Sequence, residues 1–363
     1  MKENERLREI AGKVEAGTRL SREDALTLFQ TPDLLELGRL ADLAKRRHSA
    51  DTVYFVTNLH INPTNICVNL CPLCAFAKKE DEADAYAMSL VEITAKVEGA
   101  RHQEITEVHV VGGLHPKFGL GYYEEMLRRI KAVLPQVVIQ AFTAVEVDYL
   151  SQTSGLPLEE TLARLQAAGL DSLPGGGAEV FSPRVRKRIC PKKISGERWL
   201  EIHAAAHRLG IQTNATLLYG HIETVEERVE HLLALRQQQD RTGGFLTFIP
   251  LAFHPVNTKT GEEIAGKATS GYDDLRTIAV SRLVLDNFPH IKAMWIQIGE
   301  KMAQVALSFG ADDLDGTVME EKIYHSAGAT TPQHSAKEKL RSLIRGAGKM
   351  PVERDTLYRR VGV

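Results

Sequence analysis

Strand-like and helix-like segments alternate along most of this chain, and that alternation limits the folds open to it. The first strand-like segment is VYFVTNLHI at residues 53–61, which is rich in β-branched and aromatic residues. The later ones are EVHVVGG (107–113), QVVIQAFT (136–143), LDSLPGG (170–176), IQTNATLLY (211–219), FLTFIPLAF (245–253), IKAMWIQI (291–298) and ADDLDG (311–316). Seven or eight strand–helix units predict an α/β fold, a parallel sheet closed into a (β/α)8 TIM-type barrel. A doubly wound open sheet is the alternative.

The first 50 residues lack this alternation and are expected to form an N-terminal helical extension. Ser21 followed by Asp24 gives the pattern of a capping box ahead of apolar Leu26 and Phe29. Residues 51–363 are then expected to form the barrel together with a C-terminal segment.

Charge and hydropathy exclude several classes of function. The formal net charge of −2 argues against a nucleic-acid or anionic-membrane surface, because both usually demand a basic excess. The polar start of the chain does not resemble a secretory signal, and no run approaches the roughly 18 apolar residues that cross a bilayer. We therefore expect a cytoplasmic protein whose thiols stay reduced.

Three of the four cysteines lie within eight residues, directly after the first predicted strand. Cys67, Cys71 and Cys74 form the pattern C-x3-C-x2-C, and loops after strands carry the active site of a (β/α)8 barrel. Three thiolates can hold three corners of a [4Fe–4S] cluster, which leaves the fourth iron open to a small molecule. Structural zinc, completed by His60 or Cys190, is one alternative. Three inert buried thiols are another.

This cysteine motif resembles the signature of the radical S-adenosylmethionine (SAM) superfamily. The resemblance implies a [4Fe–4S] cluster held by the three cysteines, with SAM chelated to the open iron through its amino and carboxylate groups. Phe76 matches the aromatic position that approaches the adenine of SAM. Gly112 and Gly113 match the segment that contacts its amino group, although a tight turn would explain a glycine pair equally well.

A longer series of motifs resembles the aminofutalosine synthase family, which belongs to the futalosine route to menaquinone. The motifs are HINPTNICVN, CAF, VVGGLHP, AFTAVE, GLDSLPGGGAEVF, TNATLLYGHIE, FIPLAFHP and SFGADDLDGTVMEEKIYHSAGATTP, and they cover roughly residues 50–358. Leu70, Pro72 and Leu73 depart from the basic and aromatic residues that many members carry there.

The resemblance implies an addition reaction instead of a hydrogen abstraction. The 5′-deoxyadenosyl radical adds to the enol ether of 3-[(1-carboxyvinyl)oxy]benzoate, and rearrangement with decarboxylation gives 6-amino-6-deoxyfutalosine. A reducing electron donor such as flavodoxin or ferredoxin is implied as the partner. One alternative is a hydrogen-abstracting relative, such as dehypoxanthine futalosine cyclase or a deazaflavin synthase subunit. Another is a non-catalytic iron–sulfur or zinc protein.

Four polar residues near strand ends are candidates for the site. His254 follows FIPLAF and is expected to contact a substrate carboxylate or donate a proton, with a structural histidine as the alternative. Glu179 is expected to hydrogen-bond the SAM ribose or amino group, unless it only complements a helix N-terminus. Asn214 and Thr216 share one face of a strand, so both are expected to contact SAM inside the barrel or to be hydrogen-bonded core residues.

Three acids fall close together in GADDLDGT. Asp312, Asp313 and Asp315 lack the spacing of a calcium-binding loop. They are therefore predicted to cap a helix or to contact a hydroxyl group of the substrate.

Overall fold

Seven parallel strands form one curved sheet in the computed structural model, which describes residues 2–362. Each strand lies beside its neighbour in the sequence, in the order β2-β3-β4-β5-β6-β7-β8. Their bounds are β2 Asn58–Ile61, β3 Glu107–Val110, β4 Val138–Ala141, β5 Ser172–Leu173, β6 Gln212–Tyr219, β7 Phe245–Ala252 and β8 His290–Ile291. Parallel neighbours joined by helices are the arrangement that the alternation in the sequence predicts.

A further strand, β9 (Asp313–Gly316), closes this sheet into a ring. Asp313 forms a parallel bridge with Lys292, which directly follows β8. On its other side β9 pairs in parallel with β1 (Thr52–Val56), and β1 continues into β2 after Thr57. The (β/α)8 barrel is therefore confirmed, and the open doubly wound sheet is wrong.

The strand that runs from β1 to β2 changes partner halfway along its length. β1 pairs in parallel with β10 (Met350–Arg354), whereas β2 pairs with β3. At the change, the Thr57 hydroxyl donates to a carboxylate oxygen of Glu353 (2.6 Å) and the Thr57 carbonyl accepts from the amide of Thr106 (2.9 Å). A segment close to the C-terminus thus joins β1 and β9 in a three-stranded sheet with the order β10-β1-β9, and the sequence pattern did not predict it.

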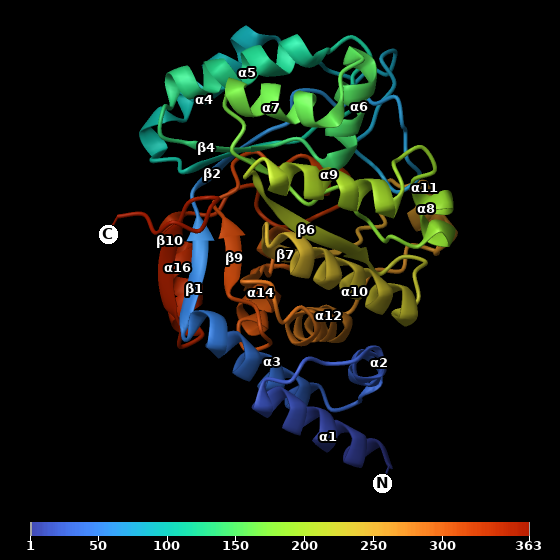
Figure 1. Ribbon diagram of the computed structural model, residues 1–363. Helices are drawn as coiled ribbons and strands as arrows, with labels where there is room; N and C mark the ends of the chain where they lie inside the picture. The colour runs from blue at the N-terminus through green and yellow to red at the C-terminus, as the bar shows by residue number, and fades with distance from the viewer. Residues whose placement is uncertain (1, 363) are drawn as a thin grey trace.

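Helices surround the ring, with α4, α5 and α7 on one side and α9, α10 and α12 on another (Figure 1). Their bounds are α1 Lys2–Ala16, α2 Arg22–Gln30, α3 Leu34–Ser49, α4 Leu90–Gly99, α5 Leu120–Val133, α6 Ala144–Ser154, α7 Leu158–Ala168, α8 Pro183–Ile189, α9 Gly196–Arg208, α10 Val225–Thr242, α11 Lys259–Glu263, α12 Gly271–Val284, α13 Trp295–Ile298, α14 Glu300–Ala306, α15 Ile323–Ser326 and α16 Lys337–Gly346, with a short 3-10 turn at Arg101–Gln103. None of the helices in residues 2–362 has both the length and the apolar character needed to cross a membrane.

The helix ends follow the local sequence. The capping box predicted at Ser21 is confirmed at the start of α2, and another opens α10 at Thr224. α10 ends at Gly243 in the left-handed conformation (φ +63°), which costs glycine little because it has no Cβ.

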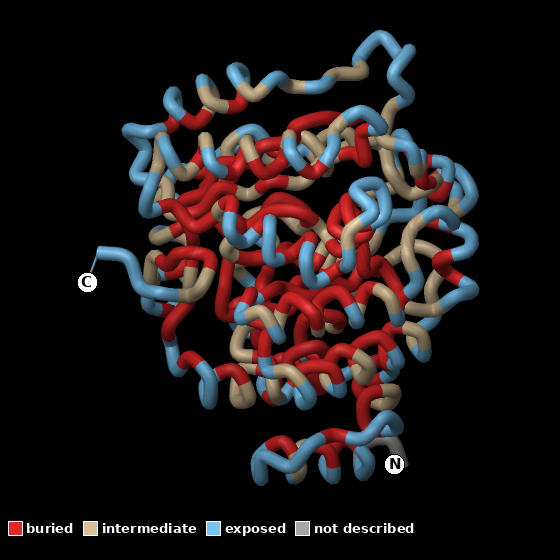
Figure 2. Tube along the Cα trace, turned by 45° about the horizontal axis from the view of Figure 1, so that its top comes forward, coloured by how far each residue is buried: buried red, intermediate tan, exposed pale blue. Residues whose placement is uncertain are grey.

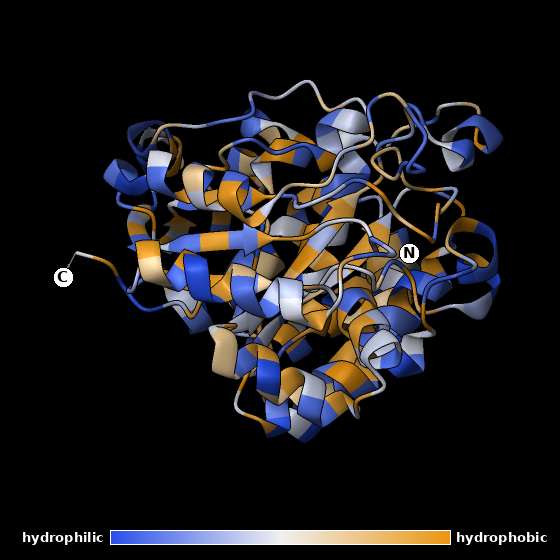
Figure 3. Cartoon of the chain, turned by 90° about the horizontal axis from the view of Figure 1, so that it is seen from above, coloured by the Kyte–Doolittle hydropathy of each residue, from blue (hydrophilic) through white to orange (hydrophobic). Residues whose placement is uncertain are grey.

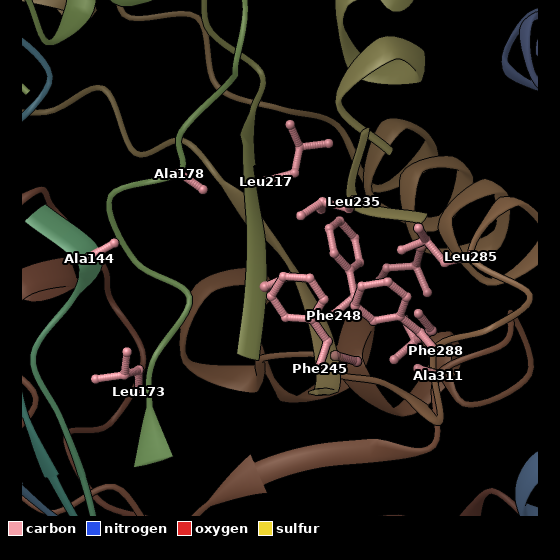
Figure 4. Packing of buried hydrophobic residues seen from close by; sticks show 14 of the residues in the cluster. Ala144, Leu173, Ala178, Leu217, Leu235, Phe245, Phe248, Leu285, Phe288 and Ala311 are labelled. Carbon is pink, nitrogen blue, oxygen red and sulfur yellow. The ribbon is translucent and has the colours of Figure 1, made fainter. Parts of the chain in front are cut away.

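The apolar core fills the space between the ring and its helices. Phe245 and Phe288 stack with ring centroids 5.3 Å apart, and Phe248 meets Phe288 edge-on at 6.3 Å, where β7 faces α12 (Figure 4). Buried residues run through the inner turns of the chain and exposed ones lie on the outer turns (Figure 2). The same division appears from above as helices with one hydrophobic and one hydrophilic face (Figure 3).

The first three helices pack below the barrel, against α10 and α12 (Figure 1). Gly38 of α3 lies against the ring of Phe309, and a Cβ at this position would come within 2.7 Å of that ring. We propose that these helices are an extension that covers the ring without contributing a strand to it.

Two predictions about the end of the barrel are wrong. The segment 291–298 is not one strand, because β8 ends at Ile291 and Trp295–Ile298 forms the helix α13. Asp312 and Asp313 neither cap a helix nor line the cavity described below. Both are fully buried: His290 Nδ1 lies 2.8 Å from Asp312 Oδ2, and Arg354 Nε donates to Asp313 Oδ2 (2.6 Å).

Replacing Arg354 with leucine is expected to lower the free energy of unfolding by about 3–5 kcal/mol, because it leaves the buried Asp313 carboxylate without its partner. Arg345→Leu is the control. Arg345 pairs with Glu338 at 2.9 Å, but both side chains are mostly exposed, so this loss should stay below about 1 kcal/mol. Urea unfolding of both variants measures the difference. Equal losses would contradict the structural role of the buried pair.

Candidate active site

A cavity of about 300 Å³ opens at the carboxyl ends of the barrel strands. Its wall includes the cysteine loop after β2, Gly112 and Gly113 after β3, Thr143 after β4, Gly175–Gly177 after β5, and His254 after β7. Deeper in the barrel, residues of β2, β3, β4, β6, β7 and β9 complete it, together with Lys292 just after β8. This end of a (β/α)8 barrel is where active sites lie, because several loops converge there.

All three cysteines of the motif line this cavity as free thiols. Backbone hydrogen bonds hold their loop: the Cys67 amide donates to the Lys78 carbonyl (3.0 Å) and the Cys74 amide to the Cys71 carbonyl (3.0 Å). Two of the three loop residues that depart from the family pattern, Pro72 and Leu73, also have hydrogen-bond partners. Leu73 donates to the Ile189 carbonyl (3.3 Å), and the Pro72 carbonyl accepts from the amide of Thr260 (3.1 Å).

Burial changes the acidity of these thiols. It raises the pKa of Cys71 to about 12 and raises the pKa of Cys74, so both are protonated near neutral pH. Metal ligation requires thiolates, and binding would therefore release protons. Cys190 is completely buried and does not line the cavity.

The cysteines are not arranged around a single ion. Within residues 2–362, no three His, Cys, Asp or Glu side chains converge to hold one metal ion. A cubane cluster does not require such convergence, because each of its cysteines binds a different iron atom. Three free thiols on one loop, facing one cavity, fit a [4Fe–4S] cluster.

The glycine pair after β3 lies against the cysteine loop. A Cβ on Gly113 would overlap the carbonyl of Ile66, and one on Gly112 would come within 3.1 Å of the Thr64 carbonyl. Glycine is therefore needed for the close approach of these two loops, in addition to any role toward a ligand.

Glu146, which also lines the cavity, holds this glycine pair from the other side. Its carboxylate accepts from the Gly112 amide (3.1 Å) and from the amide and hydroxyl of Thr143 (2.7 and 2.8 Å). Burial nevertheless raises the pKa of Glu146 to about 7. The capping box of α6 is readable in the sequence, but the contact with Gly112 is not.

Glu179 forms a buried ion pair at the edge of the cavity. Lys193 Nζ donates to Glu179 Oε1 at 2.5 Å, and both residues line the cavity. Although burial opposes it, the charge of Lys193 lowers the pKa of Glu179, so the carboxylate stays ionised. The positive charge of Lys193 also acts on Cys71. Lys193 was not singled out from the sequence, since one lysine in CPKK looks like a surface residue.

Asn214 and Thr216 face the barrel interior, as predicted from their spacing on β6. The Thr216 hydroxyl already donates to the Gly175 carbonyl (2.7 Å). The carbonyl oxygen of the Asn214 side chain is buried without a hydrogen-bond partner among the described residues. An orphaned polar atom on a cavity wall is costly unless a ligand or water meets it.

His254 and Phe76 also line the cavity. Nε2 of His254 lies 3.1 Å from the Gln297 carbonyl, and burial lowers the pKa of the ring. A carbonyl oxygen can only accept a hydrogen bond, so Nε2 carries the proton and Nδ1 is free to accept one. Phe76 is buried and meets Tyr86 edge-on with centroids 6.4 Å apart. Apart from Asp312 and Asp313, the structure therefore brings the site residues predicted from the sequence to one cavity.

Comparisons with known proteins agree with this geometry. The model of the radical SAM superfamily matches residues 61–235, and the CofH/MqnC C-terminal region matches residues 242–362. The aminodeoxyfutalosine synthase of Thermus thermophilus is 49% identical over 99% of this chain and 96% of its own length, and that of Streptomyces coelicolor is 44% identical over 97% and 93%. A 5-amino-6-(D-ribitylamino)uracil–L-tyrosine 4-hydroxyphenyl transferase of Methanosarcina barkeri is 44% identical over 94% and 90%.

Solved structures support the fold. Methylornithine synthase (PylB) superposes with a TM-score of 0.75 at 16% identity, covering 94% of this chain and 97% of that one. The FeFe-hydrogenase maturase HydG from Carboxydothermus hydrogenoformans gives 0.77 at 17% identity, covering 98% and 81%.

The barrel, the cysteine loop and the matching superfamily model define a radical SAM enzyme. This superfamily implies a [4Fe–4S] cluster and SAM, and a small-molecule substrate is consistent with the family. Identity over nearly the full length then narrows the class: the chain belongs to the aminodeoxyfutalosine synthase family.

The buried carboxyl of Glu146 gives a prediction about pH. Because its pKa in the folded protein lies near 7, above the usual 4.5, the folded state holds an extra proton between these values. The free energy of unfolding, relative to that of Glu146→Gln, should therefore fall by about 3 kcal/mol as pH rises from 4.5 to 7 and then level off.

Glu92→Gln is the matched control, since Glu92 occupies the same capping position at the exposed start of α4. Its hydrogen bonds lower the pKa of Glu92, so its contribution should be lost as pH falls, which is the opposite direction. Urea unfolding across pH 3–8 tests both, because the loss for Glu92 falls below pH 4.5. Parallel curves for the wild type and Glu146→Gln would exclude the raised pKa.

Proposed function

We propose that this chain is an aminofutalosine synthase that joins the adenosyl group of SAM to 3-[(1-carboxyvinyl)oxy]benzoate. A new carbon–carbon bond forms at the enol ether, and methionine and one carboxylate, as carbon dioxide or bicarbonate, leave to give 6-amino-6-deoxyfutalosine. The observation that carries the proposal is the cavity that three free thiols share with a glycine pair and an orphaned amide oxygen. High identity to synthases over nearly the whole chain supports it.

We propose that Cys67, Cys71 and Cys74 ligate the cluster. When bound, the cluster and SAM supply a 5′-deoxyadenosyl radical. Free thiols on one short loop can each reach a different iron, and Lys193 beside them offsets part of the negative charge that three thiolates bring into a buried site. A reducing donor such as flavodoxin or ferredoxin would supply the electron.

The other residues are assigned to binding. Phe76 presents an apolar ring for adenine, and the Gly112–Gly113 backbone lets the amino group of SAM approach closely. The free amide oxygen of Asn214 accepts from a hydroxyl or amino group, and Thr216 holds the Gly175 carbonyl beside it. Glu179, kept ionised by Lys193, accepts from the ribose hydroxyls or the amino group.

His254 is assigned to the substrate side of the cavity. Its ring is neutral near pH 7 because burial lowers its pKa. A neutral imidazole held through one nitrogen can contact a carboxylic acid or move a proton, whereas it does not supply a fixed positive charge.

The cysteine assignment predicts loss of the cluster from three variants and not from a fourth. Cys67→Ala, Cys71→Ala and Cys74→Ala should each abolish SAM cleavage and lower the iron content after anaerobic reconstitution. Cys190→Ala is the control, because this thiol is buried outside the cavity and its loss should leave both unchanged. Iron loss in the Cys190 variant with full iron in one of the others would overturn the assignment.

The reaction itself is tested by following the adenosyl group by mass spectrometry. Reduced, reconstituted protein with SAM and 3-[(1-carboxyvinyl)oxy]benzoate should give aminofutalosine and methionine in equal amounts. Free 5′-deoxyadenosine without aminofutalosine would instead favour a hydrogen-abstracting relative. Intact SAM on an iron-loaded protein would exclude both.

A further inference from the structure

The proposed substrate carries two carboxylates, and the cavity holds a buried cation that the cluster and SAM do not need. Among the cavity-lining residues in the described part of the chain, the lysines are Lys193 and Lys292. Lys193 lies beside the cysteine loop and is paired with Glu179. Lys292 directly follows β8, on another part of the wall.

Lys292 enters the cavity well below the strand ends. Its neighbour Ile291 pairs with Phe248, in the middle of β7, whereas His254 comes after the end of that strand. The cysteine loop, Gly112–Gly113 and Glu179 follow the carboxyl ends of their strands, whereas Asn214 and Thr216 lie within β6. Lys292 therefore lies deeper than the cysteine loop and is placed for a group that points away from the cluster and into the barrel.

Asp315 forms a buried ion pair with Lys292. Lys292 Nζ donates to Asp315 Oδ1 at 2.6 Å, and each side chain is only 6% exposed. Although burial opposes it, the charge of Lys292 lowers the pKa of Asp315, so the carboxylate is ionised. An ammonium has three N–H groups, and the hydrogen bond to Asp315 uses one of them.

His60 adds a second donor to the same part of the wall. Asn58 Oδ1 accepts from the Val318 amide (2.8 Å), which turns its amide nitrogen toward His60 Nε2 (3.4 Å). The ring must then carry its proton on Nδ1. Burial lowers the pKa of His60 to about 3, so the ring is neutral and donates from this one nitrogen.

We propose that Lys292, held by Asp315, binds the ring carboxylate of the substrate together with His60. The inference rests on the proposed function. The vinyl group must face the adenosyl carbon near the strand ends, and the aromatic ring separates the ring carboxylate from it. That carboxylate therefore lies on the far side of the molecule, at the depth of Lys292. Charge-assisted hydrogen bonds in a buried site give both affinity and orientation.

The experiment compares two substrates on two forms of the reconstituted enzyme. The substrates are 3-[(1-carboxyvinyl)oxy]benzoate and 2-phenoxyacrylate, which has the same enol ether without the ring carboxylate. The variant is Lys292→Met with Asp315→Asn, so that no unpaired charge is left in the barrel. The matched control is Lys349→Met with Asp42→Asn, which removes another lysine–aspartate pair (3.0 Å) at a lysine that is also 6% exposed but lies outside the cavity.

Wild type and control should prefer the diacid by about 10- to 100-fold in kcat/KM, the range of a hydrogen bond to a charged group. In the Lys292 variant the preference should fall at least tenfold toward one, because the diacid loses its charged partner and keeps only the neutral donor of His60, while 2-phenoxyacrylate loses nothing. A preference that persists in the variant would overturn the inference and leave the synthase activity standing.

The double variant could be inactive, so the binding of both compounds to the holoenzyme is also measured at equilibrium. Lys292→Arg is included in this measurement as a further variant. The arginine keeps the charge and should retain a preference in dissociation constant that the neutral pair lacks. Equal preferences in all forms would refute the carboxylate site. Wild-type enzyme that converted neither compound would refute the proposed function, and the binding preference alone would then decide the role of Lys292.

Discussion

Three acids on or beside β9 hold the barrel closed. Asp312 contacts His290 on β8, Asp313 receives Arg354 from β10, and Asp315 receives Lys292 from just past β8. The backbone joins β8 to β9 through an isolated bridge and not a full ladder, so these side chains carry much of the connection. A buried carboxylate without its partner is costly, and each pair therefore fixes the position of β9 between its neighbours.

The contact between β8 and β9 also forms part of the cavity wall. The shape of the cavity therefore depends on the closure of the ring. Asp315 has a left-handed backbone (φ +72°), an uncommon conformation that aspartate tolerates better than most residues. Its amide donates to Asp313 Oδ1 (2.6 Å), so the acid that faces Arg354 also shapes the turn that presents Asp315 to Lys292. Closure of the ring and the lining of the cavity therefore meet in one short strand, and a change at Asp313 would affect both.

Residue patterns predicted the barrel and the cysteine loop because both are local in sequence. Strand periodicity is visible in nine residues, and C-x3-C-x2-C in eight. Asp313 and Arg354 could not be paired this way, since they lie 41 residues apart and nothing in the spacing marks them as partners. The sequence does mark Lys292 in one way, because it is a single charge within an apolar segment. Such a charge indicates a buried ion pair or a ligand site. The sequence did not predict β10, because MPVER has no strand pattern of its own and forms a strand only through its pairing with β1.

The change of strand partner at Thr57, from β10 to β3, affects the order in which the protein can fold. The strand that carries the cysteine loop needs β10 along its first half and β9 on its other side, and both lie more than 250 residues further along the chain. A chain emerging from the ribosome therefore has no finished support for its cysteines until β9 and β10 have been made, and contacts of such long separation form slowly. The cysteine loop is then completed late, and loading of iron and sulfide there would follow the return of these two strands to the first.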